Sequence, residues 1–216
     1  MSTRTLLALM AAVLILPLAA RAAQVDDAVA EVEHDWEVIE YQTPTREREA
    51  RFEALWARAH RYSEANPDRS EPLVWEGIVA TSVAGEKSFL VAPVWLKRAR
   101  AVLEQALKID PDALDGLAFE QLGVLYYKAW RWPVGFWDEA KAGELLQRGL
   151  AINPKGLDAN FFYGEFMLEQ QRPAEALGYL ERAVAAPPRP GRQISDSGRR
   201  EEARQLLARA RGLASR

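Results

Sequence analysis

Few residues in this chain have side chains that could carry out acid–base, nucleophilic or metal chemistry. The 216-residue sequence contains no cysteine and two histidines, His34 and His60, each alone on an amphipathic segment. It lacks a glycine-rich phosphate loop, the H-E-x-x-H motif of zinc hydrolases and the G-x-S-x-G motif of serine hydrolases. Its many glutamates follow predicted helix surfaces, and no pair stands out as a general acid and base. The sequence therefore predicts a protein that is not an enzyme and that binds no metal or cofactor.

Aromatic residues are concentrated in one segment that could bind a ligand. Four of them fall close together, interrupted by a proline and a glycine: Trp130, Trp132, Phe136 and Trp137. They could form a hydrophobic plug that fills the gap beside a long helical hairpin, or an aromatic wall that faces a ligand. A second apolar segment, residues 84–95, leaves a similar choice between packing onto neighbouring helices and forming an exposed hydrophobic patch.

Both segments interrupt a repeated helical pattern. In three stretches, a small residue, a leucine, a second small residue and a proline follow one another at intervals of four, three and five positions. The stretches are Ala99, Leu103, Ala106, Pro111; Ala142, Leu146, Gly149, Pro154; and Ala176, Leu180, Ala183, Pro188. Upstream of each stretch a glycine lies on an apolar helix, where it allows two helix backbones to approach closely: Gly77, Gly123 and Gly164. Over residues 70–188 this pattern resembles the tetratricopeptide repeat family. The resemblance implies antiparallel helix pairs stacked into a curved solenoid that binds other proteins.

We therefore expect an all-α fold, a helix-turn-helix repeat solenoid of about nine helices with a capping helix at each end. The expected divisions are a cleavable signal peptide at residues 1–22, an N-terminal helical pair at 23–67 that forms a degenerate repeat, three repeats at 68–188, and a linker with a C-terminal capping helix at 189–216. The first two repeats carry roughly ten and seven extra residues, which are candidates for function. The prolines and glycines of residues 187–198 predict irregular structure there.

The N-terminal residues predict export. Arg4 supplies a positive charge, residues 6–18 are apolar, and Ala20-Arg21-Ala22 forms a small-x-small cleavage site. We expect a periplasmic or secreted protein with no stable membrane anchor after cleavage, because no cysteine is present to carry a lipid. Loss of Arg4 and Arg21 would reduce the 28 basic residues to 26, against 31 acidic residues, so nucleic acid is not an expected partner.

The C-terminal part of the chain is basic. From Ala186 onward it contains eight arginines and three acidic residues. These arginines could form a solvated face, pair with acidic helices, or bind an anion at Arg189 and Arg192.

The concave wall of the predicted solenoid is the expected binding surface, and the first helix of each pair lines such a wall. Shifting one repeat onto the next places the following residues there: Val74, Ile78, Glu120, Val124, Tyr127, Lys128, Phe161, Glu165 and Glu169. This mixture of apolar and charged side chains suits an extended peptide or an amphipathic ligand. Some of these residues, Phe161 among them, could instead contact neighbouring helices.

Two functions stay open at this point. The first is an exported scaffold or adaptor that binds a partner protein or peptide in the groove. For the second, the chain is also similar to the tetratricopeptide T-component of tripartite ATP-independent periplasmic transporters. That resemblance implies a periplasmic carrier or accessory component that binds a small hydrophobic or acidic ligand.

Overall fold

The computed structural model of this chain describes residues 18–129 and 135–215, and these residues form nine α-helices and no β-strand. The helices are α1 (Leu18–Gln42), α2 (Thr45–Ala65), α3 (Ser70–Glu86), α4 (Ala92–Ile109), α5 (Ala113–Lys128), α6 (Glu139–Ile152), α7 (Leu157–Glu169), α8 (Pro173–Ala185) and α9 (Gln193–Ala214). The predicted all-α fold is confirmed. Residues 1–17 of the predicted signal peptide lie outside the described part of the chain.

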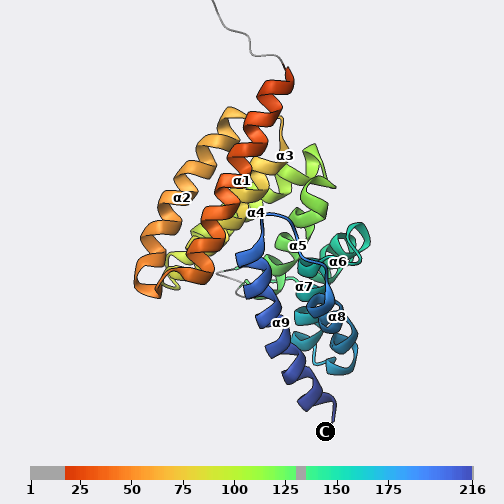
Figure 1. Cartoon of the computed structure of the whole chain (residues 1–216). Helices are drawn as coiled ribbons and strands as arrows, with labels where there is room; N and C mark the ends of the chain where they lie inside the picture. The colour runs from red at the N-terminus through yellow and green to blue at the C-terminus, as the bar shows by residue number, and fades with distance from the viewer. Residues whose placement is uncertain (1–17, 130–134, 216) are drawn as a thin grey trace, which may run out of the picture.

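Consecutive helices form antiparallel pairs that stack on one another (Figure 1). The pairs are α1 with α2, α3 with α4, α5 with α6 and α7 with α8, and the single helix α9 packs on α8 and α7. Each pair is linked to the next through the contact between its second helix and the following first helix, as α2 contacts α3 and α4 contacts α5. The result is the stack of helical hairpins that the repeated spacing predicts.

The glycines of the repeated pattern lie where two helices of a pair cross. A Cβ atom at Gly77 would lie 2.5 Å from Cγ of Leu103, and a Cβ atom at Gly123 would lie 2.5 Å from Cγ of Leu146. Both leucines are almost fully buried. Glycine is therefore required at these crossings because any side chain would displace the leucine that fills the space between the helices.

Two segments differ from the predicted helices. Leu114, Asp115 and Gly116 have positive φ angles of 52°, 58° and 80°, so the first turn of α5 is left-handed and the regular helix comes after it. The prediction of irregular structure through residue 198 is wrong for its last part, because α9 begins at Gln193. Its glycine, Gly198, is accommodated within the helix, where it allows a close contact with Tyr41 of α1.

The first helices of the pairs form an inner layer that α9 closes. Helix α1 contacts α3, α3 contacts α5, α5 contacts α7, α7 contacts α9, and α9 returns to contact α1. In Figure 1 the N-terminal end of α9 lies beside the C-terminal end of α1. The concave side of the stack is thus a ring of helices in which the last described helix meets the first.

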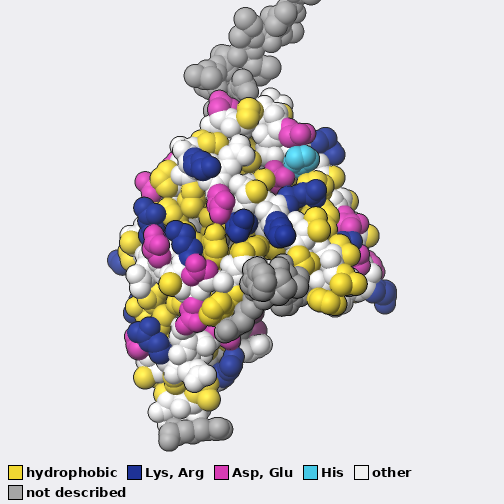
Figure 2. All heavy atoms as spheres, turned by 180° about the vertical axis from the view of Figure 1, so that it is seen from behind, with side chains coloured by type: hydrophobic (Ala, Val, Ile, Leu, Met, Phe, Trp, Pro, Cys, Tyr) yellow, Lys and Arg dark blue, Asp and Glu magenta, His cyan; other side chains and the backbone are white. Residues whose placement is uncertain are grey.

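The outer surface mixes side chains of different kinds. Lys and Arg, Asp and Glu, and hydrophobic side chains are interspersed over the face seen in Figure 2. None of the described helices combines the length and the apolar character needed to span a bilayer.

Candidate binding cavity

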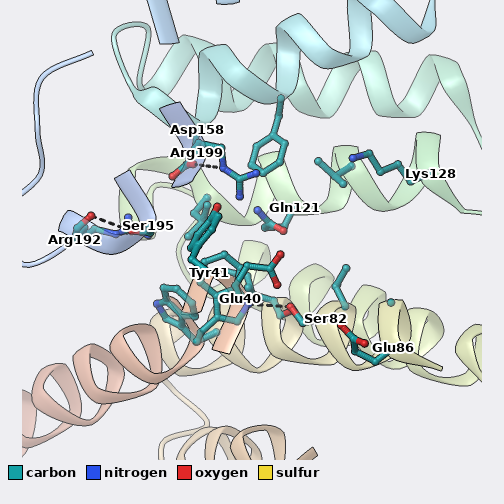
Figure 3. Close-up of a pocket in the computed structure, with 18 residues that line it drawn as sticks. Glu40, Tyr41, Ser82, Glu86, Gln121, Lys128, Asp158, Arg192, Ser195 and Arg199 are labelled. Atoms are coloured by element: carbon teal, nitrogen blue, oxygen red, sulfur yellow. Dashed lines mark hydrogen bonds and ion pairs between the residues drawn. The ribbon is translucent and has the colours of Figure 1, made fainter. Parts of the chain in front are cut away.

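A cavity of about 400 Å³ lies inside the ring of inner helices, with walls supplied by α1, α3, α5, α7 and α9. Figure 3 shows Glu40 and Tyr41 entering it from α1, Gln121 from α5, and Arg199 from α9. Its volume falls in the range of small-ligand sites, and it is too small for a folded domain.

Hydrogen bonds hold α1 against its neighbours at the edge of the cavity. The indole N–H of Trp36 donates to Oγ of Ser82 on α3, with an N···O distance of 2.8 Å. The carboxylate of Glu37 accepts a hydrogen bond from the backbone N–H of Ser195 on α9, at 3.0 Å. Ser195 lies in the first turn of α9, where backbone N–H groups have no partner within the helix. Glu37 therefore caps α9 from a different helix.

Two further contacts join α1 to α9. Glu33 forms an ion pair with Arg192, which directly precedes α9. A Cβ atom at Gly198 would lie 2.2 Å from Cε1 of Tyr41. The ring of Tyr41 on α1 therefore packs directly on the backbone of α9 at Gly198. These contacts fix where α9 crosses the concave side, and so they set the width of the cavity.

Aromatic rings form one part of the cavity wall. The rings of Trp36 and Trp75 have centroids 5.9 Å apart, and those of Trp36 and Tyr41 are 6.1 Å apart. On the opposite side, the guanidinium of Arg199 lies 4.8 Å from the ring centroid of Phe162. The wall therefore presents apolar rings from three different helices, α1, α3 and α7.

Asp158 on α7 is the centre of an arginine cluster. Its carboxylate pairs with Arg189 at 2.6 Å and with Arg199 at 3.2 Å. Burial alone would raise the pKa of this carboxyl group, but the charges of Arg189, Arg199 and Arg192 outweigh burial and bring its pKa to about 2. Arg189 and Arg192 thus pair with acidic residues, which matches one of the alternatives left open by the sequence.

Glu40 and Glu86 also line the cavity, but they differ from Asp158 in having no partner. Within the described part of the chain, neither carboxylate makes a hydrogen bond or an ion pair. Burial raises the pKa of Glu40, Arg48 and Arg199 lower it, and the charges of Glu202 and Glu86 raise it further. Among the described residues, these two carboxylates therefore have no direct hydrogen-bond or ion-pair partner, although Arg48 and Arg199 act on Glu40 from a greater distance.

The structure distributes the predicted groove residues over several environments. Ile78, Val124 and Lys128 line the cavity. Val74 and Phe161 are almost fully buried among other side chains, with 0% and 3% of their surfaces exposed. For Phe161 this corresponds to the alternative that it contacts neighbouring helices, since Arg199 of α9 covers its ring at 4.6 Å.

Lys128 of the cavity wall and three further predicted residues, Tyr127, Glu165 and Glu169, make contacts between helices. Lys128 pairs with Glu165 at 2.8 Å. The hydroxyl of Tyr127 donates to the same carboxylate, and burial raises the pKa of Tyr127 well above its usual range. Glu169 is exposed and lies 3.8 Å from Arg209 on α9. These contacts link α5 to α7 and α7 to α9, and Lys128 is the one of the four residues that lines the cavity.

Glu120 lies apart from the cavity wall. It is 3% exposed, and its Oε2 atom is buried without a hydrogen-bond partner among the described residues. A Cβ atom at Gly149 would lie 2.8 Å from its Cγ atom, so the side chain packs in the crossing of α5 and α6. Burial, and to a smaller extent the charge of Asp158, raises the pKa of Glu120 well above its usual value.

The aromatic segment lies only partly within the described residues. Trp130 and Trp132 fall outside them. Phe136 packs edge-on against Tyr126, with ring centroids 5.5 Å apart, and Arg100 stacks on it at 4.6 Å. Neither Phe136 nor Trp137 lines the cavity. The placement of Phe136 favours the plug interpretation for that residue.

The other apolar segment divides between the two alternatives. Trp95 packs back, with its ring 4.9 Å from that of Trp56. Phe89, Leu90 and Val94 are 62%, 74% and 60% exposed. The exposed residues lie at the turn between α3 and α4 and at the start of α4, and none of the three lines the cavity.

Sequence reasoning did not place α1 and α9 in the binding surface. Trp36, Glu40 and Tyr41 of α1 and Ser195 and Arg199 of α9 line the cavity. The sequence signal for a binding role of α1 is the presence of two large aromatic residues, Trp36 and Tyr41, on a helix predicted to be part of the N-terminal cap. No group of three or more His, Asp or Glu residues suited to a metal ion occurs in the described part of the chain.

Comparison with known families finds a match to the tetratricopeptide repeat over residues 138–193. Over these residues the chain is similar to the tetratricopeptide repeat. The matched residues include the pair of α7 and α8, in which the repeated spacing is clearest. The predicted resemblance is confirmed for this part of the chain. A search of curated proteins finds no significant match.

Among solved structures, the chain is similar to MamA, with 18% identity and a TM-score of 0.46 over 81% of this chain and 96% of that chain. It is also similar to a thermophilic tetratricopeptide protein of Thermus thermophilus, with 19% identity and a TM-score of 0.38 over 72% of this chain and 92% of that one.

Proposed function

We propose that this protein is a non-enzymatic interaction scaffold that receives a short segment of a partner polypeptide in its central cavity. The observation that carries the proposal is the closed ring of inner helices around a cavity of about 400 Å³. Stacked tetratricopeptide helices present their inner face to partners. Because α1 and α9 cover part of that face here, the partner would enter with a chain end or a protruding loop.

The lining of the cavity supports a peptide ligand. Aromatic rings such as Trp36 and Trp75 offer contact area, while Gln121 and Glu40 offer hydrogen-bonding groups with no partner among the described residues. Peptide recognition combines apolar pockets with a few well-placed polar groups. A purely apolar or a purely charged cavity would fit a peptide less well.

The proposal is tested by crosslinking at two matched lysine positions. A photoreactive amino acid would replace Lys128, which lines the cavity, or Lys108, which is exposed on α4 outside it. We expect a defined polypeptide, identified by mass spectrometry, to crosslink at position 128 and not at position 108. Equal crosslinking at both positions, or none at position 128, would contradict the proposal.

A second candidate function, a carrier of a small ligand, is supported by the size and partial enclosure of the same cavity. It predicts that the protein purified from its native host carries a bound small molecule. Native mass spectrometry checks this: a mass increase of a few hundred daltons that disappears on denaturation supports the carrier, and the bare chain mass counts against it.

Export is part of the same proposal and is supported by the leader pattern of Arg4, the apolar residues 6–18 and the small residues after them. We expect the protein in the periplasmic fraction to begin at Ala23. An intact N-terminus in the cytosolic fraction would contradict export.

A further inference from the structure

The charges around the cavity do not balance. Each cationic side chain of the described wall already has a carboxylate partner: Lys128 has Glu165, Arg192 has Glu33, and Arg199 has Asp158. Two further lining carboxylates, Glu40 of α1 and Glu86 of α3, have no cationic partner among the described residues. The cavity therefore has no spare positive charge for an anionic ligand, but it has two spare carboxylates for a cationic one.

The two free carboxylates lie in one electrostatic environment. The charge of Glu86 contributes to the raised pKa of Glu40, behind burial and the charges of Arg48, Arg199 and Glu202. A positive group placed near Glu40 and Glu86 would offset this repulsion and would also be a donor for acceptors that have none. In Figure 3, Glu40 and Gln121 reach into the cavity from α1 and α5, which places a carboxylate and an amide in the same space.

The aromatic part of the wall adds a second attraction for cations. Trp36 and Tyr41 come from α1 and Trp75 from α3, the same helices that carry Glu40 and Glu86. The faces of aromatic rings attract ammonium and guanidinium groups, and the attraction is stronger where water is excluded. The indole N–H of Trp36 is already used by Ser82, so the aromatic surface, and not that donor, is what this ring offers.

We infer that the cavity binds an organic cation, such as the ammonium group of a lysine side chain, between the aromatic rings of Trp36, Tyr41 and Trp75 and the carboxylates of Glu40 and Glu86. The inference rests on the proposed function, since it states which part of a partner segment enters the cavity. A free amine of low molecular weight shares the same chemistry, and the experiment separates the two sources.

The test is a titration of the purified full chain with capped pentapeptides that have a single central lysine between glycines. Indole N–H signals in nuclear magnetic resonance spectra give the readout, because Trp36 and Trp75 line the cavity. We expect the lysine peptide to bind at least about tenfold more tightly than the same peptide with an acetylated lysine, since acetylation removes the charge. A glutamate peptide should not bind.

Matched variants locate the effect. Glu40→Gln should weaken binding of the lysine peptide by about tenfold, whereas Glu31→Gln, an exposed position on the same helix, should leave it unchanged. The variant Glu40→Gln is expected to fold, because the Glu40 carboxylate has no hydrogen-bond partner to lose within the described residues; circular dichroism checks this. Lysine and acetyl-lysine peptides that bind equally, or an unchanged affinity in Glu40→Gln, would overturn the inference, as would the absence of shifts with every probe.

The two sources are compared by a parallel titration with 1,5-diaminopentane. Binding of the diamine as tight as that of the lysine peptide would assign the cavity to small amines and would support the carrier. Weaker binding of the diamine would support a peptide. In a further outcome, a polypeptide crosslinks at position 128 while the lysine and acetyl-lysine peptides bind equally well. That result would reject the cationic ligand and retain the scaffold, so failure of this inference can be told apart from failure of the proposed function.

Discussion

The carboxylate of Glu37 on α1 accepts a hydrogen bond from the backbone N–H of Ser195 in the first turn of α9, 158 positions later in the chain. Glu37 is 2% exposed and also contacts Nδ1 of His34 at 3.0 Å. A carboxylate at a helix N-terminus satisfies an otherwise unpaired N–H and interacts favourably with the helix dipole. This contact closes the ring of inner helices and turns an open groove into a cavity.

Replacing Glu37 tests how much this contact contributes. Glu37→Ala should lower the free energy of unfolding by about 1–3 kcal/mol, because the Ser195 N–H would be left buried without an acceptor. Hydrogen exchange at the start of α9 should accelerate more than exchange in α7. The neighbour His34 provides the control, since His34→Ala removes its contact with Glu37 and retains the cap. Equal losses in the two variants would show that the cap is not the important contact.

The hairpins could be predicted from the sequence because their signal is local. Small and apolar residues at steps of three and four must share a helix face, and the predicted positions Ala99, Ala142 and Ala176 are indeed fully buried. The glycines of the pattern pack against leucines of the adjacent helix, a short distance along the chain. Pattern and structure agree where the interacting residues belong to one hairpin.

The cavity could not be predicted because its parts are far apart in the sequence. Helical periodicity indicates which residues of α1 are apolar, but it does not indicate that Glu37 meets Ser195 or that Tyr41 meets Gly198. The glycine and prolines before α9 predict irregular structure through Gly198, which is wrong from Gln193 onward. Contacts with α1 override that local preference, as a tertiary cap and a close helix crossing stabilise residues that are poor helix formers.

The close crossing within a hairpin leads to a prediction for Gly123. Gly123→Ala should destabilise the protein by about 1–3 kcal/mol, because the new Cβ atom would lie 2.5 Å from Cγ of the buried Leu146 and 3.3 Å from the backbone oxygen of Ala142. Gly212→Ala is the matched control: nothing lies within 4 Å of its Cβ position in α9, so the better helix propensity of alanine should stabilise by up to about 1 kcal/mol. Urea denaturation of both variants measures the difference. A neutral Gly123→Ala would show that the helices can separate without cost.

The arginine cluster around Asp158 predicts acid sensitivity. The pKa of Asp158 is about 2 in the folded protein, against 3.8 for the ordinary group. Between these values the unfolded chain binds more protons, so the contribution of Asp158 is fully present above about pH 4 and is lost as the pH falls towards 2. The stability difference between the wild type and Asp158→Asn should shrink by about 2 kcal/mol across this range. Urea denaturation between pH 2 and pH 5 checks this, and a constant difference would contradict the assignment.

The unpaired carboxylate of Glu40 predicts the opposite dependence on pH. Burial raises the pKa of Glu40 above the ordinary value of 4.5, so the folded state holds this proton more tightly than the unfolded state. Stability should therefore fall as the pH rises from 4.5 through the folded pKa, and Glu40→Gln should lack this loss. We expect Glu40→Gln to be at least as stable as the wild type at pH 7 and the two proteins to converge near pH 4.

Thermal unfolding of both proteins at the two pH values also separates two roles for Glu40. If Glu40 serves only to hold the fold, its replacement should make the protein less stable. If Glu40 instead serves to bind a cationic ligand, its replacement should make the protein more stable and weaken its binding of the ligand. The absence of a partner for its carboxylate among the described residues leads us to expect the second result. A clear destabilisation of Glu40→Gln at pH 7 would assign Glu40 to the first role.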